Sequence, residues 1–204
     1  DTVIMNRNTS PIRPLSDQDI VDAVLATPFN QYPEDEETNF IAAYANYAGL
    51  DPRNVAVANG SDEWIQKLII QFGRGGVLAV DPDFFMYQDY ANQLGFPFFQ
   101  VESGKDFTFT LDTIIGALDE FKPSLFFLSN PQNPTGQQFS EEFLQRLADE
   151  TADRDITFVI DEAYIEFGQD YQRPDNDNVL FIRTLSKIYG VAGLRVGIAF
   201  GQGP

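Results

Sequence analysis

The segment "VAVANGSDEWIQKLIIQFGRGGVLAV", residues 55–80, contains a pattern that repeats through most of this chain. Its apolar runs at 55–58 and 76–80 are short, as is typical of buried strands, and residues 60–72 between them have the spacing of an amphipathic helix. Further strands are expected at 96–101, 124–129, 157–161, 179–184 and 195–200, and further helices at 86–94, 111–121 and 140–152. This alternation predicts an α/β fold in which a seven-stranded, mostly parallel sheet is sandwiched by helices.

Two more helices are expected before this alternation begins. Ser16 and Asp19 have the spacing of a capping box, with Asp in place of Glu, at the start of a helix that runs to about residue 27. The apolar stripe of this helix consists of Ile20, Val21, Val24 and Leu25. A second helix is expected from about residue 38 to 48, ending at Gly49. We therefore divide the chain into an N-terminal arm and helix, residues 1–30, and a large domain, residues 31–204.

The composition excludes several classes of chemistry and of partner. The 13 Lys and Arg residues face 31 Asp and Glu residues, and the formal net charge of −18 should repel nucleic acids and anionic membranes. The chain contains no Cys and no His, so thiolate and imidazole catalysis are excluded, and no loop motif for a carboxylate-bound metal is present. The sequence contains no apolar run long enough to cross a bilayer and no signal peptide, which favours the cytoplasm.

Ligands of parallel sheets bind beyond the carboxyl ends of the strands, so the residues after each strand are the candidates for a site. Ser61 and Asp62 follow the first strand at the start of a helix, where free N–H groups suit a phosphate; the alternative is an ordinary N-cap. Phe84, which follows the second strand, could stack on a flat ligand or belong to the core.

The later strand ends add polar side chains. Asn133 lies in the turn "NPQNPTG", residues 130–136, which places an amide at the edge of the sheet. Asp161 ends a buried strand, where a carboxylate needs a cationic partner; the alternative to a ligand is a structural salt bridge. The last candidates are Thr184, Ser186, Lys187 and Arg195. Taken together, these groups suit pyridoxal 5′-phosphate, whose phosphate needs donors, whose ring nitrogen needs an acid and whose aldehyde needs a lysine.

Six segments carry a resemblance to a known family: "QYPEDE" (31–36), "NGSDE" (59–63), "DPDFFMY" (81–87), "SNPQNPTGQ" (129–137), "VIDEAYIEF" (159–167) and "RTLSKIYGVAGLRVG" (183–197). In order and spacing, the chain resembles the fold-type I pyridoxal-phosphate-dependent aminotransferases, and most closely the histidinol-phosphate aminotransferases. The resemblance implies that this chain contains the cofactor-binding large domain, and that the small C-terminal domain of that family is absent from it. The segment "MNRNTSPI" (5–12) is expected to form the arm near the active site.

The resemblance also implies a role for each candidate. Lys187 would form the internal aldimine and shuttle the proton, Asp161 would pair with the ring nitrogen, and Tyr164 would hydrogen-bond the ring oxygen. Asn133 would share that last role, and Phe84 would stack on the ring. The phosphate would be held by Ser61, Asp62, Thr184 or Ser186, and Arg195. Tyr32 would reach the cofactor phosphate of a neighbouring subunit, which implies a homodimer with shared sites.

The implied reaction is a transamination in histidine biosynthesis. Histidinol phosphate and 2-oxoglutarate would give imidazole acetol phosphate and glutamate, so the partners are small amino acids and keto acids. Three alternatives stay open at this point: a phosphothreonine decarboxylase, an aromatic aminotransferase, or a truncated, non-catalytic homologue that binds the cofactor.

Overall fold

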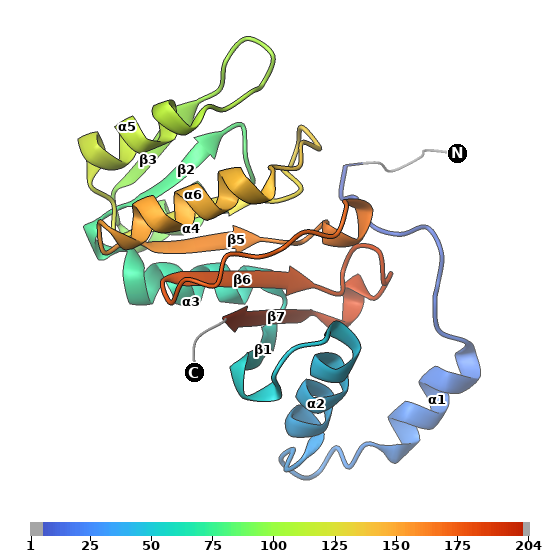
Figure 1. Ribbon diagram of the computed structural model, residues 1–204. Helices are drawn as coiled ribbons and strands as arrows, with labels where there is room; N and C mark the ends of the chain where they lie inside the picture. Colours follow the sequence, from blue (N-terminus) through green and yellow to red (C-terminus); the bar gives the residue numbers. More distant parts are fainter. Residues whose placement is uncertain (1–5, 202–204) are drawn as a thin grey trace.

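The computed structural model describes residues 6–201 and shows a central sheet flanked by helices (Figure 1). Residues 1–5 and 202–204, at the outer ends of the two expected units, lie outside the described residues. The strands are β1 (Val55–Asn59), β2 (Val77–Asp81), β3 (Phe98–Glu102), β4 (Leu125–Ser129), β5 (Thr157–Asp161), β6 (Val179–Thr184) and β7 (Val196–Gly201). They form one 7-stranded sheet in the order β1-β7-β6-β5-β4-β2-β3. Only β7 runs antiparallel to its neighbours, so the expected seven-stranded, mostly parallel sheet is confirmed.

Helices cover both faces of this sheet. On one face lie α3 (Ser61–Phe72) and α4 (Met86–Leu94); on the other lie α2 (Glu36–Ala48), α5 (Leu111–Phe121) and α6 (Glu141–Ala152). Successive side chains of β4 alternate between the two cores, with Phe127 packed against α3 and α4 and Phe126 against the other layer. Because both faces are covered, β4 is apolar throughout except for Ser129 at its carboxyl end.

The element boundaries depart from expectation by one or two residues. The second strand starts at Val77 rather than 76, since Gly76 has φ 114, outside the strand region. β3 begins after Pro97, which has no N–H to donate. Four short 3-10 turns were not expected: η1 (Pro52–Asn54), η2 (Gly73–Gly75), η3 (Ile165–Phe167) and η4 (Ala192–Leu194). Gly49 ends α2 with φ 68, as expected of a C-cap glycine.

Helix α1 (Asp17–Ala26) stands apart from the sheet and is joined to it by extended segments (Figure 1). The capping box is present: the Ser16 side chain accepts from the Asp19 amide, and the Asp19 carboxylate accepts from the Ser16 amide at 3.1 Å. No residue of α1 is buried, and Leu25 in its apolar stripe is 79% exposed. Within residues 6–201, local capping rather than tertiary packing therefore stabilises this helix.

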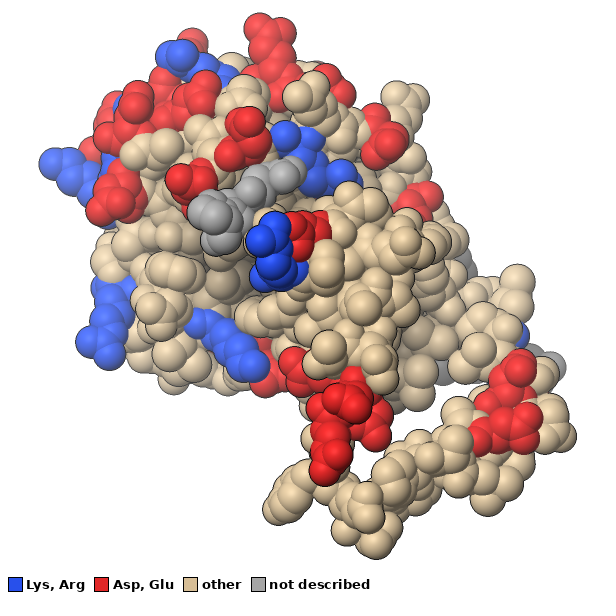
Figure 2. Space-filling view, turned by 60° about the horizontal axis from the view of Figure 1, so that its bottom comes forward, with Lys and Arg blue, Asp and Glu red and all other residues tan. Residues whose placement is uncertain are grey.

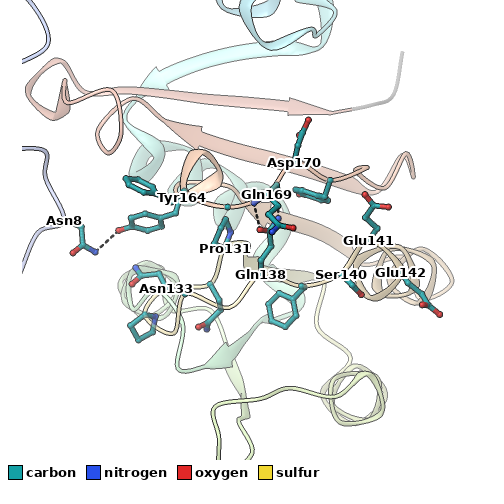
Figure 3. A pocket seen from close by; sticks show the side chains of 17 residues that line it. Asn8, Pro131, Asn133, Gln138, Ser140, Glu141, Glu142, Tyr164, Gln169 and Asp170 are labelled. Carbon is teal, nitrogen blue, oxygen red and sulfur yellow. Dashed lines mark hydrogen bonds between the residues drawn. The ribbon is translucent and has the colours of Figure 1, made fainter.

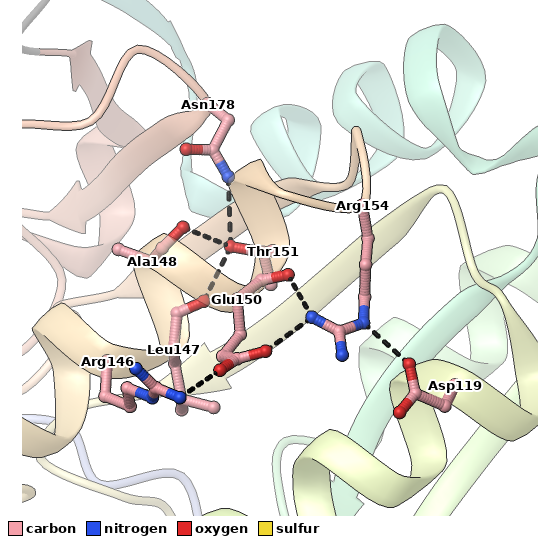
Figure 4. A network of polar contacts seen from close by, with 8 residues as sticks. All are labelled: Asp119, Arg146, Leu147, Ala148, Glu150, Thr151, Arg154 and Asn178. Carbon is pink, nitrogen blue, oxygen red and sulfur yellow. Dashed lines mark hydrogen bonds and ion pairs between the residues drawn. The ribbon is translucent and has the colours of Figure 1, made fainter.

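A polar network fastens α6 to its surroundings (Figure 4). Arg154 reaches back to Glu150 at 2.5 Å and across to Asp119 of α5 at 2.8 Å. The buried Thr151 hydroxyl donates to backbone carbonyls of its own helix and accepts from the Asn178 amide at 3.0 Å. Because Asn178 directly precedes β6, this contact connects the helix layer to the sheet.

One buried ionic cluster lies at the carboxyl ends of β5 and β6. The Glu162 carboxylate accepts from Arg173 at 2.6 Å, from Arg183 at 2.7 Å and from the Tyr171 hydroxyl at 2.5 Å. Arg183 also donates to Tyr44 of α2 at 3.1 Å. Removing the charge of this buried carboxylate should destabilise the fold, because two arginines would lose their partner.

The outer surface is strongly acidic. Figure 2 shows red side chains predominating over blue ones on the visible face, including the projecting N-terminal arm. Among residues 6–201, no helix has the length and apolar character needed to cross a membrane.

Candidate active site

A cavity opens where the expected site residues meet, at the carboxyl ends of the parallel strands. Its lining consists of Ser61, Asp62, Phe84, Ser129, Asn133, Asp161, Ala163, Tyr164, Thr184, Ser186, Lys187 and Arg195. Every residue proposed from the sequence is in this set except Tyr32, which is 94% exposed and lies outside the lining. The structure thus brings together residues that are far apart in the sequence, in the place where parallel α/β sheets bind ligands.

Asp161 is the deepest charged group of this cavity, being only 3% exposed at the end of β5. Its Oδ2 accepts from the Tyr87 hydroxyl at 2.8 Å, and its Oδ1 accepts from the Ala163 amide at 3.0 Å. Burial raises the pKa of Asp161 to about 6, against the opposing effect of these two donors. Among the described residues it has no ion pair, so the structural salt bridge considered from the sequence does not form.

The end of the cavity that contains Arg195 is formed by residues next to β1, β6 and β7. Since β7 is antiparallel, Arg195 precedes its strand and still lies at the same edge as residues that follow parallel strands. Its guanidinium donates to the Ser186 hydroxyl at 3.2 Å and pairs with Asp62 at 3.1 Å. The Ser186 hydroxyl in turn accepts from Thr184 at 2.9 Å.

At this end of the cavity, the backbone at Gly60 lies very close to Gly197 and to the Arg195 side chain. Helix α3 begins after Gly60 (φ 81) and has no side-chain cap, so the expected alternative of a Ser or Asp N-cap does not form. A Cβ on Gly60 would lie 2.2 Å from Nη2 of Arg195, and one on Gly197 would lie 2.2 Å from the Gly60 carbonyl carbon. Only glycines permit this approach, which leaves uncapped helix N–H groups beside a guanidinium, an arrangement suited to a phosphate.

Lys187 is half-buried and lines the same cavity. Its Nζ lies 5.5 Å from the centre of the Tyr164 ring and donates to the Arg7 carbonyl at 3.2 Å. The Tyr164 hydroxyl accepts from the Asn8 side chain at 3.0 Å (Figure 3). The N-terminal segment expected near the site therefore contacts it through residues 7 and 8.

Phe84 and Asn133 occupy the remaining wall. The Phe84 ring is half-buried and packs edge-on against Tyr87, with centroids 5.7 Å apart. The backbone N–H of Asn133 donates to the Ser129 hydroxyl at 3.0 Å. A larger hollow of about 940 Å³ lies alongside and shares only Asn133 and Tyr164 with this lining, so the candidate groups do not converge in it (Figure 3).

Sequence reasoning missed three contributors. Tyr87 lies in the quoted segment 81–87 but was given no role, and its hydroxyl donates to Asp161. Asp83 was passed over, although it is an acid between a buried strand and a helix, as Asp161 is an acid after a buried strand. Ser129 carries no sequence signal beyond ending its strand.

Comparison with known proteins places this geometry in a family. The model for aminotransferases of class I and II matches residues 13–203. A histidinol-phosphate aminotransferase of Caldanaerobacter subterraneus subsp. tengcongensis is 37% identical over 191 residues, covering 91% of this chain and 54% of the relative. One from Hydrogenobaculum sp. is 39% identical over 189 residues, covering 90% of this chain and 52% of the relative. The chain thus spans about half the length of the curated relatives it matches.

Among solved structures, the histidinol-phosphate aminotransferase from Sinorhizobium meliloti, crystallised in complex with pyridoxal 5′-phosphate, superposes with a TM-score of 0.80. The match covers 96% of this chain and 55% of that one, at 24% sequence identity, and it supports the fold. The family match spans nearly the whole chain, from the N-terminal arm to the last strand. This chain belongs to the class I and II aminotransferases.

Proposed function

We propose that this chain is the cofactor-binding part of a pyridoxal-phosphate-dependent histidinol-phosphate aminotransferase. The observation that carries the proposal is Asp161: a buried carboxylate without a cationic partner among residues 6–201, in the same cavity as Lys187 and Arg195. A buried acid of this kind stabilises a cation, and the ring nitrogen of the cofactor supplies one when it is protonated.

The donor set fits the cofactor at each of its ends. Arg195, the Ser186 hydroxyl and the uncapped start of α3 offer charge and hydrogen bonds to a phosphate. Lys187 offers the primary amine that an aldehyde requires. Phe84 offers a ring face, and the Asn133 and Tyr164 side chains offer polar groups to the ring oxygen. When bound, the cofactor supplies an electron sink that stabilises negative charge on the substrate Cα.

The chain's own groups would hold and move the protons. The Asp161 carboxylate would accept a hydrogen bond from the protonated ring nitrogen and so keep the proton there, while the Tyr87 hydroxyl holds the carboxylate in place. Because the chain contains no histidine, Lys187 would be the base that moves the proton to and from the substrate Cα. The Arg7 carbonyl and Tyr164 ring that flank its Nζ would orient the amine.

The substrates of the proposed reaction are histidinol phosphate and 2-oxoglutarate, giving imidazole acetol phosphate and glutamate. Support comes from the names of the relatives at 37% and 39% identity and from the retained segments of residues 31–36 and 183–197. We also propose a cytoplasmic location, as expected for such a step in histidine biosynthesis. Because the chain spans about half of those relatives, the activity is proposed for the protein that carries it.

We further propose a homodimer in which Tyr32 serves the cofactor site of the other subunit. Its side chain is 94% exposed and outside the cavity lining of its own chain, as such a role requires. The proposed division is an arm and helix at residues 1–30 and a cofactor domain at 31–204. It is supported by the position of α1, which lies apart from the sheet and buries no residue.

Two measurements test the function. Mixing the chain with pyridoxal 5′-phosphate should give visible absorbance that borohydride abolishes, with the reduced cofactor on the peptide containing Lys187. Lys187→Ala should lose this label, whereas Lys67→Ala, on the outer face of α3, should keep it. In the natural protein, turnover should be highest with histidinol phosphate. Faster turnover with phosphothreonine or phenylalanine would refute histidinol phosphate as the substrate. If no reduced cofactor is found on the Lys187 peptide, the cofactor assignment is refuted.

A further inference from the structure

A second carboxylate, that of Asp83, lies directly behind the cavity in the connection between β2 and α4. Its Oδ1 accepts from the Ser129 hydroxyl at 2.5 Å and from the Phe84 amide at 2.7 Å. Its Oδ2 accepts from the Ser129 amide at 3.2 Å. Asp83 forms no ion pair within residues 6–201, so these three donors hold it.

These hydrogen bonds continue into the cavity wall. A serine hydroxyl has one proton to donate and two lone pairs that accept. Since the Ser129 proton goes to Asp83, its lone pairs are free for the backbone N–H of Asn133, which donates at 3.0 Å. Asp83 thus determines which way the Ser129 hydroxyl points, and through it the position of Asn133. The bond to the Phe84 amide fixes the start of the aromatic wall directly.

The same cluster borders Asp161. Ser129 and Asp161 are register partners on β4 and β5, and the Asn130 amide donates to the Asp161 carbonyl at 2.8 Å. Desolvation raises the pKa of Asp83 to about 7 against the opposing effect of its three hydrogen bonds, and the charge of Asp161 adds a smaller increase. Tyr87, Asp62 and Glu162 are the other titratable groups that act on this pair.

We propose that Asp83 is a positioning residue of the cofactor site, which through Ser129 and the Phe84 amide fixes two of the side chains expected to contact the cofactor ring. This role rests on the proposed function, and it gives a purpose to a half-buried acid that has no cationic partner within residues 6–201. Asp83 itself does not line the cavity; it acts through residues that do.

The first test needs no cofactor. In Asp83→Asn, one carboxylate oxygen becomes an NH₂ group, which would face donors from Ser129 and Phe84. The backbone amide resonances of Asn133 and Phe84 in a ¹H–¹⁵N spectrum of the cofactor-free chain should therefore move. The matched control is Ser124→Ala, at the other end of β4, where the hydroxyl accepts from the Gly75 amide at 3.0 Å. It should move the Gly75 resonance and leave Asn133 and Phe84 in place.

The second test measures cofactor binding. Asp83→Asn and Ser129→Ala should each raise the dissociation constant for pyridoxal 5′-phosphate about tenfold, the loss expected from one hydrogen bond to a charged group. The double variant should be within about twofold of the single ones, because both act along one path. The pH midpoint of the bound-cofactor absorbance should fall in Asp83→Asn, since a negative charge near the cationic site is removed. Ser124→Ala should keep the wild-type constant and midpoint.

The outcomes separate this inference from the proposed function. An Asn133 resonance that stays in place in Asp83→Asn overturns the inference, whether or not the cofactor binds. A moved resonance with unchanged cofactor affinity and midpoint overturns it as well, because the cluster would then be structural only. Failure of the wild-type chain to bind the cofactor refutes the proposed function, while the spectrum of the cofactor-free chain still decides whether Asp83 positions Asn133.

Discussion

Replacing the candidate ring-nitrogen partner should make the cofactor-free chain more stable. The carboxyl of Asp161 has an ordinary pKa of 3.8, and burial raises it to about 6 in the folded chain. At about 1.36 kcal/mol per pKa unit, this difference means that ionised Asp161 costs the fold about 3 kcal/mol. In Asp161→Asn, the amide can still accept from Ala163 and donate to the Tyr87 oxygen, so few hydrogen bonds are lost.

The sign of the pH dependence follows from the raised pKa. The folded chain binds this proton more tightly than the unfolded chain, so the stability of the wild type falls as the pH rises from about 4 through about 6. Asp161→Asn lacks that loss, and its advantage should be about half as large near pH 5 as the full value of about 3 kcal/mol near pH 8. Urea unfolding followed by the fluorescence of Trp64, the single tryptophan, measures both values.

Two further measurements complete this test. The exposed Asp106→Asn removes the same charge from the acidic surface and should leave the unfolding free energy within about 0.5 kcal/mol of wild type. Pyridoxal 5′-phosphate should stabilise the wild type, which gains a cation beside Asp161, much more than the asparagine variant. A variant no more stable than the wild type near pH 8, or an advantage that does not grow with pH, would refute the reasoning.

Four other changes have expected outcomes. Arg195→Ala should weaken pyridoxal 5′-phosphate about tenfold to a hundredfold in a spectroscopic titration, yet leave weak pyridoxal binding unchanged; equal losses for both ligands would contradict a phosphate role. Gly60→Ala should lose phosphate affinity because its Cβ would meet Arg195, whereas Gly49→Ala, with φ 68 but open space, should cost only about 1 kcal/mol of stability in urea unfolding. Glu162→Gln should lower the unfolding free energy by about 3 kcal/mol, with no such loss for the exposed Glu142→Gln. If subunits share sites, mixing inactive Lys187→Ala with Tyr32→Ala should restore activity that neither has alone; no recovery after subunit exchange would exclude the shared site.

Most of the fold could be predicted from hydrophobic periodicity. Each expected strand and helix exists, because parallel strands buried on both faces leave apolar runs such as that of β4. Strand order could not be obtained in this way: the position of β7 between β1 and β6 depends on the pairing of residues 55–59 with residues 196–200. The short turns η1 to η4 escaped because three residues are too few for a periodic signal.

The site could be located by its edge and by family resemblance, but its supporting contacts could not. Asp161 and Lys187 follow from where strands end, Arg195 follows from the resemblance, and the cavity contains all three. The hydrogen bonds from Tyr87 to Asp161 and from Ser129 to Asp83 depend on side-chain directions across different strands, which a single sequence does not specify. The contact of Asn8 with Tyr164 depends on the path of an irregular arm, where no periodic pattern applies.

The pairing of β1 with β7 has a consequence for the order in which the protein matures. The phosphate end of the cavity requires Gly60 and Gly197 in close contact, so it joins the first strand of the sheet to the last. Contacts of such long sequence separation form slowly, because a large loop must close before they are made. During synthesis, the parallel strands β2 to β6 can assemble on the ribosome before β7 emerges, but the phosphate end of the cavity cannot. Capture of the cofactor would therefore mark the completion of the sheet.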